Sequence, residues 1–417
     1  MIDVQKLCSD ASYRQRSIDK GADPGLIDKV CDLSSARSEH LQTTEATRAK
    51  ANSMAKEIGA AAPDEREVKI AEASELKAEL AVAEEKLETI QSEFDSLSLE
   101  IPNPAHESVP QGGEENFQVE EVFGSTPAAK ISHGDIGEAL GIVDTERAVR
   151  MSGSRFGYIM AEAARLQFGL IQWTLEKLDS YGFVPVVTPV LVREEMMELS
   201  GFFPTDKSTA YKIEGDDHYL IGTSEVALAG LHRQEQLDVD NLPLRYAGYS
   251  SCFRREAGTY GKDTSGLFRL HQFDKVEMFT YVHPDNSWDE LERIRKIQTE
   301  IFSELELPFR VITTAAKDLG SAAAKKYDLE VWLPSEQRYR EITSCSNYTD
   351  YSARRMNTTV KIDGKKQLVH TLNGTACAVG RTLLNIFENH QTDDGAVLIP
   401  KVLQPYCGGI EAIEPKN

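Results

Sequence analysis

The chain has no hydrophobic run long enough to cross a membrane and no leader of the secreted type. A transmembrane helix needs about 18 consecutive apolar residues, and no such run occurs. The first residues, MIDVQKLCSDASYRQR, lack the basic and then apolar layout of a secretion signal. We therefore expect a cytoplasmic protein that has no membrane partner.

Cysteine is also scarce, with 6 residues that lie far apart in the sequence. None of them belongs to a C-x-x-C pair, and none is grouped with histidine at the spacing of a zinc site. The cysteines are Cys8, Cys31, Cys252, Cys345, Cys377 and Cys407. In a cytoplasmic protein, cysteines placed in this way are expected to be reduced. The pattern predicts neither a disulfide framework nor a structural zinc.

Two familiar phosphate-binding loops are absent as well. No G-x-x-x-x-G-K-[ST] segment and no G-x-G-x-x-G segment follows a predicted strand. The first would indicate a P-loop and the second a dinucleotide-binding fold. Any nucleotide site in this chain must therefore be built in another way.

Positive charge is in short supply, since 46 basic residues face 67 acidic ones and the net charge is −21. Such an excess of negative charge repels nucleic acids. DNA binding is not expected. RNA binding is possible only where basic residues are locally concentrated.

The length and the residue types that are present indicate a large globular protein. A chain of 417 residues is long enough for two or three domains. Its 27% charged and 41% hydrophobic residues are ordinary for such a fold.

Two long helices are predicted after a short amphipathic helix near the N-terminus, at about 26–58 and 65–100. In the second, apolar residues alternate at spacings of four and three, which is the pattern of a coiled-coil seam. These residues are Leu76, Leu80, Ala83, Leu87, Ile90, Phe94 and Leu97. The first has a weaker seam of Val30, Leu41, Ala51, Ala55 and Ile58, interrupted by Thr44 and Arg48. We predict an antiparallel two-helix coiled coil, with a compact bundle as the alternative.

A proline-rich stretch divides the chain into two predicted domains. The helices end at Ile101-Pro102-Asn103-Pro104, and the residues that follow to Gly113 are typical of a linker. We expect an N-terminal domain at 1–104, with the coiled-coil arm at about 26–100, and a second domain at 105–417.

The second domain has strands in runs rather than in strict alternation with helices, which favours an antiparallel sheet surrounded by helices, an α+β fold. Residues 184–191 form a proline-bearing strand, which we place at a sheet edge or an interface. Other predicted strands lie within 211–221 and at 308–313, 328–333, 339–345 and 368–379. Helices are predicted at 156–181, at 287–305 and from about residue 380 onward.

The stretch from Tyr249 to Phe279 is the most informative part of the sequence. Two alternating runs are joined by a long charged loop with Gly258, Gly261 and Gly266, as in an open antiparallel hairpin. Arg254, at the end of the first strand, can present its planar guanidinium to a phosphate. The order FRRE, loop, R-x-HQF resembles the second signature motif of class II aminoacyl-tRNA synthetases. The wording FRREAG followed by HQFDKVE resembles the seryl-tRNA synthetases.

Other segments carry the same resemblance. Residues 223–225 (TSE), 341–347 (EITSCSN), 372–375 (LNGT) and 379–382 (VGRT) are similar to stretches of that family. The helix at 156–181 and the proline-bearing strand resemble the first class II motif, which forms the dimer interface in the family. The resemblance covers nearly the whole chain, and it implies a homodimer.

The resemblance implies a ligase that uses ATP and Mg²⁺. In such a ligase the carboxylate of L-serine attacks the α-phosphate of ATP, and the seryl group then passes to tRNA(Ser), with tRNA(Sec) as a second candidate. Catalysis needs positioning and neutralised phosphate charge rather than a protein nucleophile. By resemblance, Arg254 and Arg381 are the catalytic residues.

The resemblance also assigns the two binding pockets. The residues implied for serine are Thr223, Ser224, Glu225, Arg254, Glu277, Asn373 and Thr375. Those implied for ATP are Arg254, Arg255, Glu256, Phe273, Glu341, Ile342, Thr343, Ser344 and Arg381, with Phe273 and Arg381 stacking on the adenine. Glu341 and Ser344 are implied for Mg²⁺.

Several of these residues have simpler interpretations. Phe273 could be a core aromatic, Glu277 a solvated strand residue, and Glu341 a partner of Arg340. Two residues also depart from the family pattern, because Arg255 stands where a small polar residue is common and Thr375 stands where serine is common.

Two other classes of function remain open. The chain could be an inactive synthetase-like interaction protein, but Arg254, Glu256, Glu341 and Arg381 are all intact. It could instead load an amino acid onto a carrier protein, but such ligases lack a long arm.

The charges of the arm predict which helix meets RNA. The first helix carries five basic and five acidic residues, whereas the second carries four and eleven. We therefore expect the first helix to contact tRNA phosphates, through Arg37, Lys50 and Lys56.

Overall fold

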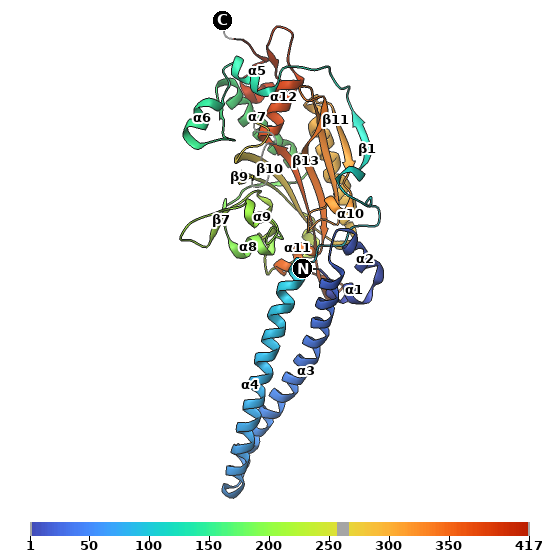
Figure 1. The fold of residues 1–417 in the computed structure, drawn as a ribbon, viewed down its shortest axis with the longest axis vertical. Coiled ribbons are helices and arrows are strands. Elements are labelled where there is room, and N and C mark those ends of the chain that lie inside the picture. Colours follow the sequence, from blue (N-terminus) through green and yellow to red (C-terminus); the bar gives the residue numbers. More distant parts are fainter. Residues whose placement is uncertain (1, 257–266, 416–417) are drawn as a thin grey trace. The chain divides into compact units, whose positions relative to one another are not determined.

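The computed structural model describes residues 2–256 and 267–415 (Figure 1). The loop predicted between residues 256 and 267, with its three glycines, lies outside the described residues. The chain divides into two compact units, Met1–Pro104 and Ala105–Asn417. In the described ranges, every helix is too short or too polar to span a membrane.

The N-terminal unit consists of four helices, where one short and two long helices were predicted. They are α1 (Val4–Ser9), α2 (Ala11–Asp19), α3 (Pro24–Ala60) and α4 (Pro63–Glu100). The extra division arises because the Asp10 side chain accepts hydrogen bonds from the Ser12 and Tyr13 amides and caps α2. Proline at the first position starts both α3 and α4, since its missing N–H costs nothing there.

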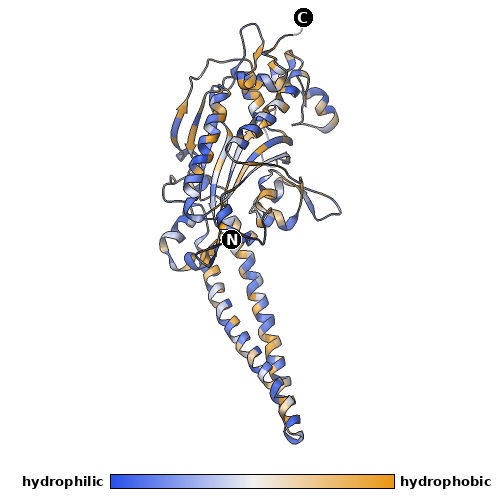
Figure 2. Cartoon of the chain, turned by 180° about the vertical axis from the view of Figure 1, so that it is seen from behind, coloured by the Kyte–Doolittle hydropathy of each residue, from blue (hydrophilic) through white to orange (hydrophobic). Residues whose placement is uncertain are grey.

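Helices α3 and α4 form the predicted antiparallel coiled-coil arm (Figure 1). Every residue of the seam predicted for α4 is buried or half-buried, including Phe94 at 5% exposure. Inter-helix ion pairs join Lys29 to Glu93 and Arg48 to Glu84. Hydrophobic and hydrophilic positions alternate along both helices (Figure 2).

The seam predicted for α3 was wrong in part. Leu41 is 40% exposed, whereas Thr44 is 1% exposed and lies in the seam. A repeat of three and four residues runs through the buried or half-buried positions Val30, Leu33, Arg37, His40, Thr44, Thr47, Ala51, Met54 and Ile58. Thr44 tolerates burial because its hydroxyl donates to the carbonyl of His40, 2.8 Å away.

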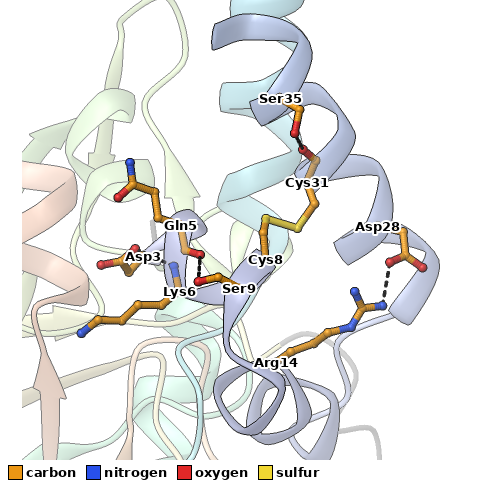
Figure 3. Close-up of a disulfide and its surroundings, with 9 residues drawn as sticks. All are labelled: Asp3, Gln5, Lys6, Cys8, Ser9, Arg14, Asp28, Cys31 and Ser35. Atoms are coloured by element: carbon orange, nitrogen blue, oxygen red, sulfur yellow. Dashed lines mark hydrogen bonds and ion pairs between the residues drawn. A yellow bond between two sulfur atoms is a disulfide. The ribbon is translucent and has the colours of Figure 1, made fainter.

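The prediction of reduced cysteines was wrong for one pair. Cys8 of α1 and Cys31 of α3 form a disulfide at the base of the arm (Figure 3). Their Cα atoms are 5.6 Å apart because α1 packs against α3, a contact that the sequence spacing did not reveal. The ion pair from Arg14 to Asp28 also joins α2 to α3. The other four cysteines are buried and free.

The second unit is built on a single eight-stranded sheet, in agreement with the predicted α+β fold. Its strand order is β1 (Gln118–Phe123), β11 (Phe309–Thr313), β12 (Lys325–Leu333), β13 (Arg338–Thr349), β16 (His370–Ala378), β10 (Gln272–Val282), β9 (Leu244–Phe253) and β4 (Val184–Val187). All of these neighbours are antiparallel except β4 and β9, which are parallel.

Eight α-helices, six short 3₁₀ helices and four small sheets complete the described part of this unit. The helices are α5 (His133–Ala139), α6 (Thr145–Ser152), α7 (Ala161–Ser180), α8 (Glu194–Leu199), α9 (Glu225–Ala229), α10 (Ser287–Glu304), α11 (Tyr351–Met356) and α12 (Val379–Asn389). The small sheets pair β2 (Val143–Asp144) with β3 (Tyr158–Ile159), β5 (Leu191–Arg193) with β7 (His218–Leu220) and β6 (Tyr211–Lys212), β14 (Thr359–Ile362) with β15 (Lys365–Leu368) and β8 (Gln236–Leu237), and β17 (Val397–Leu398) with β18 (Ala412–Ile413).

Two local predictions need correction. The proline-bearing strand does lie at a sheet edge, but it ends at Val187, and Leu191 begins β5 in another sheet. The segment after residue 104 is not a free linker, because Ala105 and Val109 are buried against Tyr348 and its neighbours. Small apolar side chains between prolines allow this segment to pack on the sheet.

Helix α10 covers one face of the sheet at β13 and β16. It comes so close that a Cβ atom on Gly374 would lie 2.5 Å from Ile294 of α10. Successive strand residues point to opposite faces, so Asn373 and Thr375 point away from α10. The candidate site lies on that opposite face.

Candidate functional site

Two adjoining cavities lie on the face of the sheet opposite α10. The first, of about 150 Å³, is lined by Arg254, Glu256, Leu267, Phe268, Arg269, Leu270, Phe273, Lys275, Glu341, Ile342, Thr343, Ser344, Thr375, Ala378, Gly380 and Arg381. The second, of about 460 Å³, shares Arg254, Lys275, Ser344 and Thr375 with it and is also lined by Thr223, Glu225, Tyr348 and Asn373. Most of the residues predicted from the sequence for the two substrates thus line one or both of these neighbouring cavities, whereas Ser224, Arg255 and Glu277 line neither.

Glu277 of β10 is the centre of the second cavity's polar cluster, although it is not exposed to solvent at all. Its carboxylate accepts hydrogen bonds from the Thr375 hydroxyl at 2.9 Å, the Asn373 amide at 3.0 Å and the Thr223 hydroxyl at 3.4 Å. Antiparallel pairing sets Glu277 directly opposite Thr375. The interpretation of Glu277 as a solvated strand residue is therefore wrong.

Lys275 completes this cluster and was not predicted from the sequence. It lies two residues before Glu277 on the same face of β10 and forms an ion pair with its carboxylate. A buried carboxylate needs such compensation, because an unpaired charge in a protein interior is costly. The charged residues at alternate positions of the segment 274–277 (DKVE) are the sequence feature that could have indicated a role for Lys275.

Glu225, at the start of α9, borders the same cluster. Burial and the nearby charge of Glu277 raise the pKa of Glu225 to about 7. A hydrogen bond from the hydroxyl of Tyr348 opposes this shift. Tyr348 was also not predicted from the sequence.

Ser224, which was predicted to bind serine, has a structural contact, since its hydroxyl donates to the Gly248 carbonyl at 3.2 Å.

One buried acceptor beside Glu277 is left without a partner. Within the described residues, the Oδ1 atom of Asn373 is buried and has no hydrogen bond. Buried polar atoms in native proteins are nearly always paired. This oxygen is therefore placed to accept a hydrogen bond from a ligand that carries an ammonium or hydroxyl group.

The arginine pair at the end of β9 divides between the cavity and the surface. Arg254 lines both cavities, and its guanidinium carbon lies 5.4 Å from the centre of the Phe273 ring. Arg255 has an exposed side chain and lines neither cavity. Glu256 lines the first cavity and pairs with Arg269 at 2.7 Å.

Arg381 lies in the wall of the first cavity together with an aromatic residue that was not predicted. Its guanidinium carbon is 4.8 Å from the ring centre of Phe268, and that of Arg340 is 3.9 Å away. Arg340 also pairs with Glu336. Phe273, the aromatic residue predicted to stack on adenine, is half-buried in the same cavity.

A β-bulge brings Glu341 and Ser344 into the same cavity. These residues are three apart, so in a regular strand they would point to opposite faces. The register between β12 and β13 shifts at Ile342, which has no partner across the ladder. Although burial opposes its charge, nearby Arg381 and Lys326 lower the pKa of Glu341.

Gln298 of α10 forms hydrogen bonds with two strands of the site, β13 and β16, from the face of the sheet opposite the cavities. This fully buried amide donates to the carbonyls of Ser344 and Thr375, each at 2.8 Å. The Thr375 carbonyl lies beside a second bulge, where Ala376 has no partner on β10. Gln298 thus provides a hydrogen bond to the Thr375 carbonyl, at the place where the bulge interrupts the regular pairing of β10 and β16.

The close approach of α10 makes Gly374 a test of this architecture. Gly374→Ala should displace β16 or α10, because the added methyl group would also lie 3.0 Å from Cys345. We expect a loss of about 1–3 kcal/mol of unfolding free energy and weaker ligand binding in the second cavity, since Asn373 and Thr375, which line it, flank the site of strain. Chemical denaturation and ligand-binding measurements give the two effects. Gly59→Ala in α3, where the added methyl group also meets open space and lies outside the cavities, is the matched control. Equal behaviour of the two variants would contradict the role of close packing.

Comparison with protein-family models gives two matches. Residues 1–105 match the seryl-tRNA synthetase N-terminal domain, and residues 209–390 match the tRNA synthetase class II core domain (G, H, P, S and T).

Similar proteins cover the chain from end to end. A serine–tRNA ligase of Streptomyces avermitilis is 44% identical over 100% of this chain and 99% of its own. One from Mycobacterium avium is also 44% identical, with the same coverage. The crystal structure of seryl-tRNA synthetase from Pyrococcus horikoshii complexed with ATP has a TM-score of 0.92, 37% identity and full coverage of both chains. The cytoplasmic serine–tRNA ligase of Naegleria fowleri in complex with AMP has a TM-score of 0.87 at 32% identity, covering 97% of this chain and 96% of its own.

Proposed function

The chain belongs to the seryl-tRNA synthetase family and is a class II serine–tRNA ligase, and from this premise we propose which residues carry the reaction and which partners they meet. The reaction has two steps. The carboxylate of L-serine attacks the α-phosphate of ATP and pyrophosphate leaves. A ribose hydroxyl at the end of tRNA(Ser) then attacks the carbonyl of the seryl adenylate, and AMP leaves.

The observation that carries this assignment is the buried cluster around Glu277. Its carboxylate, with the unpaired Oδ1 of Asn373, offers acceptors to the ammonium and hydroxyl groups of serine. Thr223 and Thr375 hold Glu277 in place. A pocket whose wall is polar in this way suits serine better than an apolar amino acid.

The adjoining arginine-rich cavity is the proposed ATP site. Arg254 would hold the α-phosphate and the serine carboxylate, and Glu256 the adenine amino group. Phe273 and Arg381 would enclose the adenine ring. Burial and the neighbouring cations Arg254, Arg269 and Arg340 lower the pKa of Arg381, which indicates how much positive charge is gathered there. Ile342 and Thr343 would contribute their backbone, since Ile342 is a buried core residue. Arg255 would contribute least.

The donors present also fit a magnesium ion bound with ATP. Glu341 and Ser344 supply the oxygen ligands that Mg²⁺ prefers, and the lowered pKa of Glu341 keeps its carboxylate ionised. When bound, the ion would neutralise phosphate charge. Glu341 and Ser344 would hold it, while Arg254 orients the α-phosphate toward the serine carboxylate.

Serine-dependent exchange of labelled pyrophosphate into ATP tests the first step, and charging of tRNA(Ser) tests the second. Activity in both assays supports the proposal. No exchange from a folded preparation with serine, ATP and Mg²⁺ would favour the inactive interaction protein. Exchange without tRNA charging would favour a carrier-protein ligase. Charging of tRNA(Sec), which we propose as a second acceptor, is measured in the same way.

The N-terminal unit is the proposed tRNA-binding domain, with the basic positions of α3 as its contact surface. Lys50 and Lys56 are exposed, and within the described chain neither forms an ion pair. Arg37, which was predicted with them, is half-buried between the helices and lies 5.4 Å from the Phe94 ring centre. The RNA-contact proposal therefore rests on the two lysines.

Exchanging these two charges should separate the two steps of the reaction. Lys50→Glu with Lys56→Glu should weaken tRNA charging and reduce its salt dependence by about one unit of slope for each phosphate that is no longer bound. Serine-dependent pyrophosphate exchange should not change, because it needs no tRNA. Lys77→Glu with Lys86→Glu on the acidic helix α4 is the matched control, since both lysines are also exposed. An equal loss of charging in the two double variants would contradict a one-sided RNA surface.

A homodimer is the proposed assembly, formed through the elements that resemble the first class II motif. Phe168 of α7 is 68% exposed, and Val184 and Val187 of the edge strand β4 are 56% and 81% exposed. Neighbouring apolar residues left in water in this way are typical of an interface. We propose the cytoplasm as the location, since charging of tRNA serves translation, although a disulfide is uncommon there.

A charge on the edge strand should dissociate the proposed dimer. Val187→Lys should shift the protein toward the monomer, as measured by sedimentation velocity across a range of concentrations, because a lysine would be desolvated in the interface. Val122→Lys, on β1 at the other edge of the sheet, is the control, since Val122 is 59% exposed. A wild-type protein that stays monomeric, or equal dissociation in both variants, would count against this interface.

A further inference from the structure

A buried chain of hydrogen bonds lies next to the proposed ATP cavity, and the reaction proposed above gives its residues no role. It begins at Glu388, in the last turn of α12, whose side chain is fully buried. One carboxylate oxygen accepts from the amide of His133 at 2.9 Å, from His133 Nδ1 at 2.7 Å and from the Ser335 hydroxyl at 2.9 Å. The other accepts from the Ser335 amide at 3.0 Å.

These contacts determine which nitrogen of His133 carries the proton. A carboxylate can only accept hydrogen bonds, so Nδ1 must be the protonated nitrogen that donates to Glu388. In the neutral ring, Nε2 is then left with a free lone pair. The Leu267 backbone N–H donates to this atom at 3.2 Å. Hydrogen bonds from His133 and Ser335 lower the pKa of Glu388 against the effect of burial, so the carboxylate that fixes this tautomer remains ionised.

Leu267 connects this chain to the nucleotide cavity. It is 3% exposed and lines that cavity together with the next two residues, Phe268 and Arg269. Phe268 lies against the guanidinium groups of Arg340 and Arg381. Arg269 pairs with Glu256. The position of the Leu267 backbone therefore affects several proposed ATP contacts at once, while His133 itself does not line the cavity.

We propose that His133, oriented by Glu388, is a positioning residue for ATP, which acts by holding the backbone of Leu267 through Nε2. The histidine ring is suited to this task because one nitrogen donates while the other accepts. The inference rests on the proposed ATP role of the first cavity. It concerns binding of ATP and not of serine, because the serine cluster around Glu277 has no contact with this chain of hydrogen bonds among the described residues.

Two substitutions of His133 test the contacts of Nδ1 and of Nε2 separately. Asparagine at this position retains a donor near Nδ1 but has no acceptor that reaches Leu267. Glutamine carries an acceptor near the position of Nε2 but loses the contact to Glu388. His133→Asn should therefore raise the KM for ATP about 5- to 10-fold, the effect of losing one hydrogen bond. The KM for serine and the kcat should change little, and His133→Gln should restore most of the ATP affinity.

The measurement is serine-dependent pyrophosphate exchange at varied ATP and varied serine, with thermal unfolding of each variant. Ser335→Ala is the control, because it removes a hydroxyl that donates to Glu388 but leaves both hydrogen bonds of the His133 ring in place. It should lower the unfolding temperature without raising the KM for ATP. Parallel rises in both KM values in His133→Asn and His133→Gln would show a merely structural role and overturn the proposal. So would a wild-type KM for ATP in His133→Asn.

A wild-type measurement covers the case in which the variants do not fold. Site-resolved hydrogen exchange should show a slowly exchanging amide at Leu267, and fast exchange there would overturn the proposal. The wild-type kinetics also distinguish the two levels of inference. If the wild-type protein exchanges no pyrophosphate, the proposed function fails. If it does, and His133→Asn has normal ATP kinetics, only the role of His133 fails.

Discussion

Replacement of Arg254 by alanine should reduce serine-dependent pyrophosphate exchange on the order of 10²–10³-fold, the usual cost of removing a group that stabilises developing charge. Arg254 lines both cavities, at the place where the serine carboxylate would meet the α-phosphate of ATP in the proposed binding sites. A cation beside both groups reduces the repulsion between these two anions. Because the side chain is exposed to the cavity, its loss should change the unfolding free energy by less than about 0.5 kcal/mol.

Arg255→Ala provides the comparison. The side chain of Arg255 is exposed and lines neither of the two cavities, and its backbone amide donates to the Thr209 carbonyl at 2.8 Å. Its removal should leave exchange nearly unchanged at saturating ATP. Equal defects in the two variants, measured as kcat/KM for ATP and for serine, would contradict the conclusion that Arg254 points into the cavities and Arg255 points away from them.

Activation of serine should exceed activation of alanine by about 10⁴–10⁵-fold in kcat/KM, since a site built to bind a hydroxyl is left with unpaired groups by an analogue that lacks it. Here the penalty would fall on Glu277 and on Oδ1 of Asn373, both buried. Threonine keeps the hydroxyl and meets only a steric barrier at Thr375. It should therefore be the best of the poor substrates.

Pyrophosphate exchange with each amino acid measures this discrimination. The alanine rate must be corrected for traces of serine, which a second preparation of alanine controls. Comparable exchange with alanine and serine would contradict the roles given to Thr223, Glu277 and Asn373. A threonine rate below that of alanine would contradict the steric account of Thr375.

Local sequence patterns were sufficient for the sheet and the arm, whereas the pocket residues were named by family resemblance and their roles stay predictions. Period-two and heptad patterns report directly on strands and on coiled-coil seams, and they were clear in β10 and α4. In α3 the seam was obscured because polar residues such as Thr44 and His40 occupy it. A side chain that satisfies itself on its own helix, as Thr44 does, can be buried without being apolar.

Features created by tertiary packing were not accessible in this way. The bulge at Ile342, which turns Glu341 and Ser344 to one side, depends on the register between two strands rather than on either sequence. The disulfide depends on α1 folding back against α3. Lys275 was visible as a charged strand residue, but only its burial beside Glu277 distinguishes it from a solvated lysine.

The amide of Gln298 bears on how this site could be redesigned. It donates hydrogen bonds to the carbonyl of Ser344 on β13 and to that of Thr375 on β16. A shift of either strand would therefore move Gln298 and change its hydrogen bond to the other strand. Substitutions that share a partner are not additive. Changes at Thr375 made to admit another amino acid should therefore alter the proposed nucleotide half of the pocket, and their free-energy effects should not sum with those of changes at Ser344. Engineering of specificity on this scaffold has to treat the two strands as a single unit.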